Sequence, residues 1–199
     1  MGPVQSNLLP LPVRAWAAKR TESGGRGRRK IYLLALTLLL AATATQAAEP
    51  EAPAQLTGLF IQGCLPFAGN PVALRGWASQ HGLPDLPDPA TKAFLHGAAG
   101  RAFDASPLGA KLVLASSDDG ICSAITDRAA SSAVAQALEA GLQKAGVAFR
   151  LAIDRDDTNV RTLHFREYLA TKSGRSWRIL AATVNDPAGG QAMLTAAPE

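Results

Sequence analysis

Residues 111–122, KLVLASSDDGIC, form the stretch of this chain that decides the fold. After Lys111 the stretch has three consecutive apolar residues at 112–114, continues with the turn formers at 116–120, and returns to a β-type residue before Cys122. Apolar runs on both sides of a polar, glycine-containing turn predict an antiparallel hairpin. We therefore expect strands at 111–115 and 121–126, and we expect this hairpin to lie in the middle of a sheet.

Cys122 closes this stretch, and Cys64 is the only other cysteine in the chain. Two cysteines in an exported protein favour a disulfide, and closing this 58-residue loop would stabilise the fold by about 4 kcal/mol. Two free thiols are one alternative. A lipidated Cys64 is another, because residues 61–64 resemble a lipobox, although the apolar stretch before them is too short. We expect Cys64 on a helix that packs beside the strand of Cys122, with the α-carbons within about 7 Å.

The first 47 residues have the order of a secretory signal peptide. Residues 1–30 contain seven Lys or Arg and one acid, and residues 31–44 are uncharged with six leucines. Residues 45–47 place small side chains at the two positions that a signal peptidase reads. The apolar run of 14 residues is shorter than the about 20 residues that span a bilayer. We therefore expect cleavage after residue 47 rather than a retained anchor, and a periplasmic or secreted protein.

The formal charge of the whole chain, +4, comes from this leading segment. Seven of the 20 basic residues and one of the 16 acidic residues precede residue 48, which leaves 13 basic and 15 acidic residues. A net charge near −2 removes the electrostatic basis for binding nucleic acid. The remaining 152 residues match one domain. We expect a flexible lead-in at 48–54 and the folded part at 55–196.

The order of helical and strand patterns predicts an α+β fold. The clearest helical pattern is the apolar stripe of Val134, Leu138 and Leu142. We expect an antiparallel sheet of about five strands, with N-terminal helices and one long inserted helix packed on one face. The expected helices are 55–67, 72–81 and 131–145, and the expected strands are 102–105, 111–115, 121–126, 147–153, 161–170 and 175–184, with 193–195 as an additional edge strand.

Alternation within the expected strands predicts which side chains share a face. In the second hairpin, the residues expected on one buried face are Leu163, Phe165, Leu169, Trp177, Ile179 and Ala181. The strand at 147–153 places four apolar residues on one face: Val147, Phe149, Leu151 and Ile153. The other face of the sheet, which we expect to be in contact with water, carries Arg150, Thr162, His164, Arg166 and Arg178.

Six short motifs together resemble a family of short exported proteobacterial proteins and lipoproteins. The motifs are CLPF at 64–67, LRGWA at 74–78, GLP at 82–84, FD at 103–104, KLVL at 111–114 and SSDDGICSA at 116–124. The resemblance covers about residues 55–145. It implies export and the paired cysteines Cys64 and Cys122, and it implies no activity. This chain departs from the lipoproteins of the family in its lipobox, so we expect no membrane attachment after signal cleavage.

No residues of the chain have the spacing of a familiar catalytic or metal site. Asp118 and Asp119 could bind a hard cation, but turns also select Asp and Gly. Residues 154–159 begin like a calcium loop, but the glycine and the glutamate that such a loop needs at its sixth and twelfth positions are missing. The three histidines have no second histidine or cysteine at ligand spacing; they are His81, His96 and His164. We therefore expect no catalytic residue, no metal and no cofactor.

Four arginines on or near the second hairpin are candidates for a binding surface: Arg161, Arg166, Arg175 and Arg178. They would suit an anionic ligand or an acidic partner, although a solvated face interleaved with Glu167 is the simpler interpretation. Trp77 and the proline-rich residues 83–89 form a second candidate surface. We expect a non-catalytic periplasmic domain that binds a protein or another cell-envelope component, in an oligomeric state that the sequence does not predict. The alternatives are a hydrolase that uses the hairpin-tip aspartates or His164, and a small-ligand carrier with a pocket between the helices and the sheet.

Overall fold

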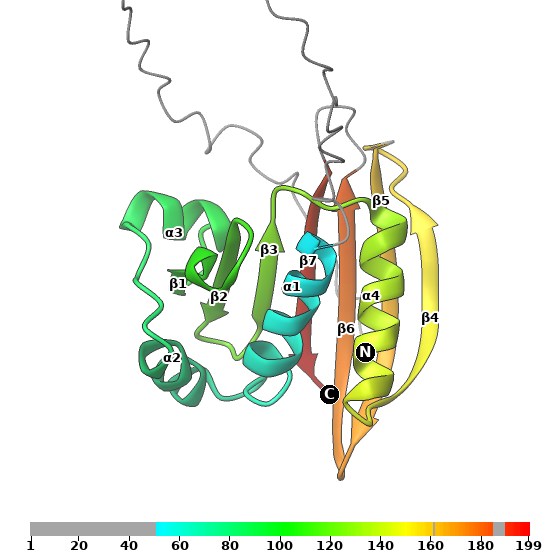
Figure 1. The fold of residues 1–199 in the computed structure, drawn as a ribbon, viewed down its shortest axis with the longest axis horizontal. Coiled ribbons are helices and arrows are strands. Elements are labelled where there is room, and N and C mark those ends of the chain that lie inside the picture. The colour runs from blue at the N-terminus through cyan, green and yellow to red at the C-terminus, as the bar shows by residue number, and fades with distance from the viewer. Residues whose placement is uncertain (1–50, 161, 185–189) are drawn as a thin grey trace, which may run out of the picture.

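The computed structural model describes residues 51–160, 162–184 and 190–199, so the expected signal peptide lies outside the described residues. Seven strands form one antiparallel sheet in the order β1-β2-β3-β7-β6-β5-β4, with helices packed against it (Figure 1). This arrangement confirms the α+β class. The strands are β1 (Gly100–Asp104), β2 (Leu112–Ser117), β3 (Cys122–Thr126), β4 (Ala148–Asp156), β5 (Leu163–Lys172), β6 (Arg175–Val184) and β7 (Gln191–Pro198). The helices are α1 (Glu51–Leu59), α2 (Pro71–Gln80), α3 (Asp88–Phe94) and α4 (Ser131–Lys144), with a π-helical turn η1 (Phe60–Cys64) after α1 and a 3-10 turn η2 (Ser106–Leu108) after β1.

The sheet is larger than the expected five strands, and its C-terminal strand is not at an edge. β7 is the middle strand of the seven and pairs with β3 on one side and β6 on the other. The expectation of an edge strand at 193–195 is therefore wrong. Ala192, Met193 and Leu194 are at most 7% exposed, so consecutive residues are buried on both faces of this strand. Such a strand suits the interior of a sheet, whereas edge strands usually carry charges that discourage further pairing.

α1 and α4 lie side by side across one face of the sheet (Figure 1). The two segments come close at Gly141, where a Cβ atom would lie 2.6 Å from Thr57 Cγ2 of α1 and 2.7 Å from Ile61 Cδ1 of η1. Glycine is therefore the residue that lets the two helices touch. α1 begins at Glu51, inside the segment 48–54 that we expected to be a flexible lead-in.

α3 lies on the opposite face of the sheet, so the expectation that all helices cover one face is wrong. Phe94 and Leu95, at the end of α3, pack against Val113 and Ala115 of β2 in a second apolar cluster. The proline-rich segment leads the chain to this face past the edge of β1, where Leu86 N donates to a β1 carbonyl at 2.8 Å. Prolines suit this path because they favour an extended chain that is not part of a helix.

The β5–β6 hairpin has a different register from the one that we expected. Only two residues form its turn, so Lys172 pairs with Arg175 and Tyr168 pairs with Ile179. Tyr168 therefore shares the helix-covered face with Trp177 and Ile179, in one core cluster. The residues expected on that face from β5 are on the other one: Leu163, Phe165 and Leu169. The expected alignment fails because the turn length, rather than the apolar pattern, sets the register.

A β-bulge in β4 changes the face of half of that strand. Leu151 pairs with Tyr168 and Ile153 pairs with Glu167, so Ala152 is the extra residue. Ile153 consequently points to the face opposite that of Leu151, against the expected alternation. The bulge also places Asp154 of β4 opposite Arg166 of β5, and Asp156 opposite His164. We expected Arg166 and His164 on the wet face of the sheet, but they lie on the face that the helices cover.

The expected disulfide is confirmed. Cys64 ends η1 and Cys122 begins β3, and the two residues are bonded with their α-carbons 5.3 Å apart. The bridge holds a helical turn against a strand of the first hairpin, as the sequence predicts. None of the described helices is long and apolar enough to cross a membrane.

Candidate functional site

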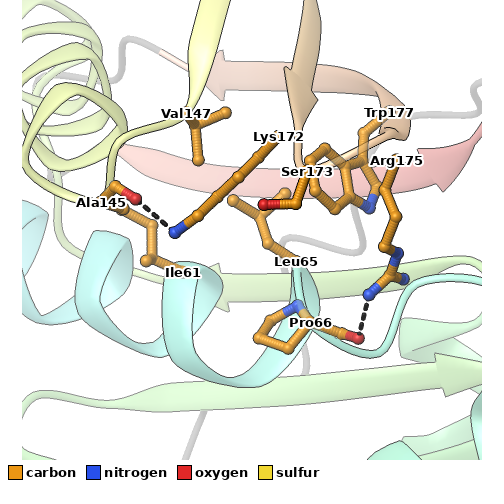
Figure 2. A pocket seen from close by; sticks show the side chains of 9 residues that line it. All are labelled: Ile61, Leu65, Pro66, Ala145, Val147, Lys172, Ser173, Arg175 and Trp177. Carbon is orange, nitrogen blue, oxygen red and sulfur yellow. Dashed lines mark hydrogen bonds between the residues drawn. The ribbon is translucent and has the colours of Figure 1, made fainter.

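A cavity lies where the end of the β5–β6 hairpin meets the ends of η1 and α4 (Figure 2). Its volume is about 260 Å³. We call it the hairpin pocket, and it lies between helices and sheet. Its nine lining residues are Ile61, Leu65, Pro66, Ala145, Val147, Lys172, Ser173, Arg175 and Trp177.

The floor of the hairpin pocket is apolar and its rim is polar. Leu65, Val147 and Trp177 are buried, whereas Lys172 and Arg175 are exposed. Figure 2 shows the two cationic side chains diverging from the hairpin, one toward the end of α4 and the other toward the chain after η1. A ligand in this pocket would therefore meet hydrocarbon below and positive charge at two sides.

The turn of the hairpin explains why both cations reach the same cavity. Ser173 and Gly174 have φ values of 51° and 77°, and two central residues with positive φ are typical of a type I′ turn. Gly174 adopts its positive φ without strain and adds no side chain to the turn. Lys172 and Arg175 are directly paired across the turn, so their side chains lie on the same face of the hairpin.

The wall of the hairpin pocket that faces the β5–β6 hairpin depends on the π-helical turn η1. Leu65 N donates to Phe60 O at 3.0 Å, which closes a wider turn than that of an α-helix. This turn points Cys64 toward β3, where the disulfide fixes it, and it leaves Leu65 and Pro66 facing the hairpin. The disulfide therefore also anchors one wall of the hairpin pocket.

Both cations at the rim are bonded to neutral main-chain carbonyl groups. Lys172 Nζ donates to Ala145 O, and Arg175 donates to Pro66 O at 2.7 Å and to Ala68 O at 3.1 Å. These bonds satisfy carbonyl groups at helix ends, where positive charge is favourable. A lysine has three donors and an arginine has five, so each keeps donors for a ligand. Among the described residues no carboxylate forms an ion pair with either cation.

The four arginines that we expected to share a surface are dispersed. Arg175 lines the hairpin pocket, with its guanidinium 5.2 Å from the ring centroid of Trp177. Arg166 lies on the sheet face that α4 covers, and it pairs with carboxylates of α4 and β4. Arg178 points to the opposite face, where it pairs with Glu167 at 3.7 Å. Arg161 lies outside the described residues.

Trp77, the fifth expected contact residue, packs α2 against neighbouring segments. Its ring stacks on His81 with centroids 4.1 Å apart, and it lies against the backbone of η1 at Gly63. Phe67 adds a second aromatic contact at 6.3 Å. This tryptophan joins α2 to the disulfide-bearing turn.

A polar cluster lies on the helix-covered face of β4 and β5 and contacts α4 at Glu139. The two ring nitrogens of His164 lie 2.8 Å from carboxylate oxygens of Asp154 and Asp156. Tyr168 is fully buried and donates to Glu139 of α4 at 2.9 Å. Burial, followed by this hydrogen bond, raises the pKa of Tyr168 to about 12. The cluster joins helix to sheet, and its residues are not among those that line the hairpin pocket.

The aspartates of the first hairpin close its turn. Asp118 accepts from Arg75 of α2, and Asp119 accepts from the Ser117 hydroxyl and from the main-chain N–H of Ile121. In the second acidic segment, residues 154–159, Asp157 likewise accepts hydrogen bonds from main-chain N–H groups of its own loop. These bonds, led by that of Val160, lower the pKa of Asp157. The described residues contain no group of three or more potential ligands that could hold a metal ion.

Most of the hairpin pocket was not expected from the sequence, since only Arg175 is among the candidate residues. The local signal is a Ser-Gly turn flanked by two cations, Lys172 and Arg175, which predicts a tight hairpin with paired positive charges. The other lining residues come from segments far away in the chain and carry no such signal. A comparison of the chain with protein-family models, curated proteins and solved structures returned no match.

Proposed function

We propose that the protein is an exported, non-catalytic binding domain, and that its hairpin pocket holds an acidic group attached to an apolar body on a cell-envelope component. The observation that carries this proposal is the pairing of an apolar floor with two cations that have no carboxylate partner among the described residues. The disulfide fits export, because such bonds persist in oxidising compartments.

The chemistry of the lining supports binding rather than hydrolysis. Its nine residues include no acid and no histidine, and general acid–base catalysis depends on such groups. The residues on which a hydrolase would depend are bonded elsewhere: Asp118 to Arg75, Asp119 to Ser117, and His164 to two aspartates.

The size of the hairpin pocket favours a group on a larger component over a free ligand. Pockets that enclose a small molecule usually measure about 300–1,000 Å³, whereas this one has about 260 Å³ and an exposed rim. An acyl chain end or an aromatic acid would therefore enter only with its acidic end group and the adjoining carbons. The rest of the component would remain outside.

A titration with octanoate tests the proposal, since this probe combines a carboxylate with a short apolar chain. We expect the indole N–H resonance of Trp177 to shift saturably and that of Trp77 to stay unchanged. Octylammonium has the same chain and a positive head group, and it should not compete. Equal binding of both probes would mean that the cations do not select the ligand, and the proposal would fail.

A pair of matched variants sharpens this test. Replacing Lys172 and Arg175 by serine should weaken octanoate binding by at least about tenfold, because two charge-assisted hydrogen bonds are lost. Replacing Lys92 and Arg178 by serine removes the same charge outside the hairpin pocket and should leave binding unchanged. Thermal melting of both variants establishes that they are folded. If the two double variants bind equally, the site is wrong.

A further inference from the structure

The two edges of the sheet differ in whether chain covers them. The edge at β1 is covered, because Leu86 N donates to Ala102 O and Asp104 N donates to Pro84 O, both at 2.8 Å. Asp85 forms an isolated bridge with the same strand. At the other edge, β4 pairs within the described residues with β5 alone, and Figure 1 shows it as the outermost strand. An open edge presents unpaired N–H and C=O groups to an incoming strand.

The bulge in β4 gives this edge a patterned side-chain row. On the face opposite α4, Arg150, Ile153 and Arg155 lie beside Leu169, Glu167 and Phe165 of β5, which are successive same-face positions of a regular strand. We call these three residues of β4 the edge row; all three are exposed, Ile153 by 38%. In a regular strand, residues three apart in the sequence, such as Arg150 and Ile153, would point to opposite faces, so the bulge at Ala152 is what puts them on one face.

The charge of the edge row is largely uncompensated. Neither arginine of the row forms an ion pair among the described residues, and the nearest acid on this face of β5, Glu167, is paired with Arg178. Asp154 and Asp156 point to the other face, where they contact His164. Asp157 interacts with Arg155 electrostatically, but its carboxylate also accepts two main-chain N–H groups.

We propose that β4 binds an extended segment of an acidic partner protein, with an acid, an apolar residue and a second acid at alternate positions facing the edge row. Main-chain pairing with β4 supplies the attachment, and the row selects the sequence. The spacing follows from β5, where residues two apart lie beside the members of the row. This binding site is separate from the hairpin pocket and does not depend on the function proposed for it.

A second copy of this chain is a poor occupant of the same edge. Antiparallel pairing about a two-fold axis at Ile153 would place Arg150 of one copy opposite Arg155 of the other. Like charges that face each other across two strands are destabilising. The row therefore discourages self-association at an edge that no other described residue pairs with, and it favours a partner of opposite charge.

Fluorescence anisotropy with a fluorescein-labelled peptide, SETVTES, tests the proposal. We expect saturable binding of this peptide and none of SKTVTKS, which places lysines opposite the arginines. Replacing Arg150 and Arg155 by glutamate should weaken binding by about tenfold or more, because two attractions become repulsions. In spectra of the ¹⁵N-labelled protein, the shifted amide resonances should belong to β4. A failure of SETVTES to bind, or shifts confined to other strands, would overturn the proposal.

Three controls separate edge pairing from general attraction. SETVTES with alternate amides N-methylated keeps its charges but cannot pair along the edge, so equal binding of this peptide would refute the proposal. The variant with Lys92→Glu and Arg128→Glu makes the same change in charge away from β4 and should bind as wild type does. The serine variant of Lys172 and Arg175 should also bind normally, so that failure of the hairpin pocket and failure of this edge are distinguishable. Circular dichroism checks that each variant is folded. A stable dimer that protects the β4 amides would show that a second copy occupies the edge, and it would contradict the proposal.

Discussion

The three strands on one side of β7 have a covalent link to the helix layer and a covered outer edge, whereas the three strands on the other side have neither among the described residues. β3 is joined covalently to η1 through the bond between Cys64 and Cys122. The turn between β2 and β3 is tied to α2 by the ion pair of Arg75 with Asp118. The outer edge of β1 is covered by a segment that includes Asp85. We call β1–β3 the fastened half.

The other three strands, β4–β6, form the open half. Their contact with the helix layer includes the hydrogen bond between Tyr168 and Glu139 and the ion pair between Arg166 and Glu139. β4 is exposed along almost all of its length. The edge row belongs to this half, and the β5–β6 hairpin supplies the cations of the hairpin pocket.

Links that lower the entropy of the unfolded chain or that cover an edge are concentrated on one side of the sheet. The other side keeps exposed main-chain groups and cations, which recognition requires. Local opening is easiest where few buried contacts hold a strand, so we expect hydrogen exchange to be faster in β4 than in β2.

The largest expected effect comes from breaking the covalent link of the fastened half. Replacing Cys64 or Cys122 by serine should lower the free energy of unfolding by about 4 kcal/mol, because the 58-residue loop is no longer closed in the unfolded chain. Replacing both should cost little more, since a single bond is lost in each case. Urea unfolding measures the loss, and hydrogen exchange should show that β3 loses more protection than β5. A loss below about 1 kcal/mol would contradict the assignment of the main fastening to this bond.

A smaller effect is expected where α4 touches α1 and η1. Gly141→Ala places a Cβ atom 2.6 Å from Thr57 Cγ2 of α1 and 2.7 Å from Ile61 Cδ1 of η1, so these side chains or the helices must shift. We expect a loss of about 1–2 kcal/mol in the free energy of unfolding, since overpacking outweighs the gain in helix propensity. Gly58→Ala is the matched control, because nothing lies within 4 Å of its added Cβ atom, and it should raise stability by up to about 1 kcal/mol. Equal effects of the two variants in thermal melting would show that the contact between α1 and α4 is not tight.

The fastened half was more predictable from the sequence than the open half. The first hairpin follows from local turn chemistry, and the disulfide follows from having only Cys64 and Cys122 to pair. Outside both halves, the α4 stripe likewise needs only helical periodicity. These features depend on residues close together in the chain or on a single possible partner, so the pattern of residue types is sufficient.

The open half depends on single-residue shifts that residue types do not encode. The two-residue turn at Ser173 and Gly174 sets which face of β5 is buried, and the extra residue Ala152 inverts half of β4. A shift by one residue exchanges the faces of a strand. The hairpin pocket combines η1, the end of α4 and a hairpin, and no local pattern indicates that these segments meet. The central position of β7 depends in the same way on long-range pairing.

The smallest expected effect concerns the buried hydrogen bond that fastens the open half to α4. Tyr168→Phe should lower the free energy of unfolding at pH 7 by about 1 kcal/mol, because one hydrogen bond to Glu139 is lost while the ring stays packed.

The ionisation of Tyr168 tests the same hydrogen bond. In a Tyr32→Phe chain Tyr168 is the sole tyrosine, so its ultraviolet absorbance reports one group. We expect it to ionise near pH 12 in the folded protein, compared with about 10 for an ordinary tyrosine. A raised pKa means that the folded state holds its proton more tightly than the unfolded state does. The stabilisation from Tyr168 is therefore complete below pH 10 and is lost as pH rises toward 12. The difference in free energy of unfolding between the Tyr168→Phe variant and the chain that keeps Tyr168 should shrink over that range. Ionisation near pH 10 would mean that the Tyr168 hydroxyl is solvated and that the bond to α4 does not hold the open half.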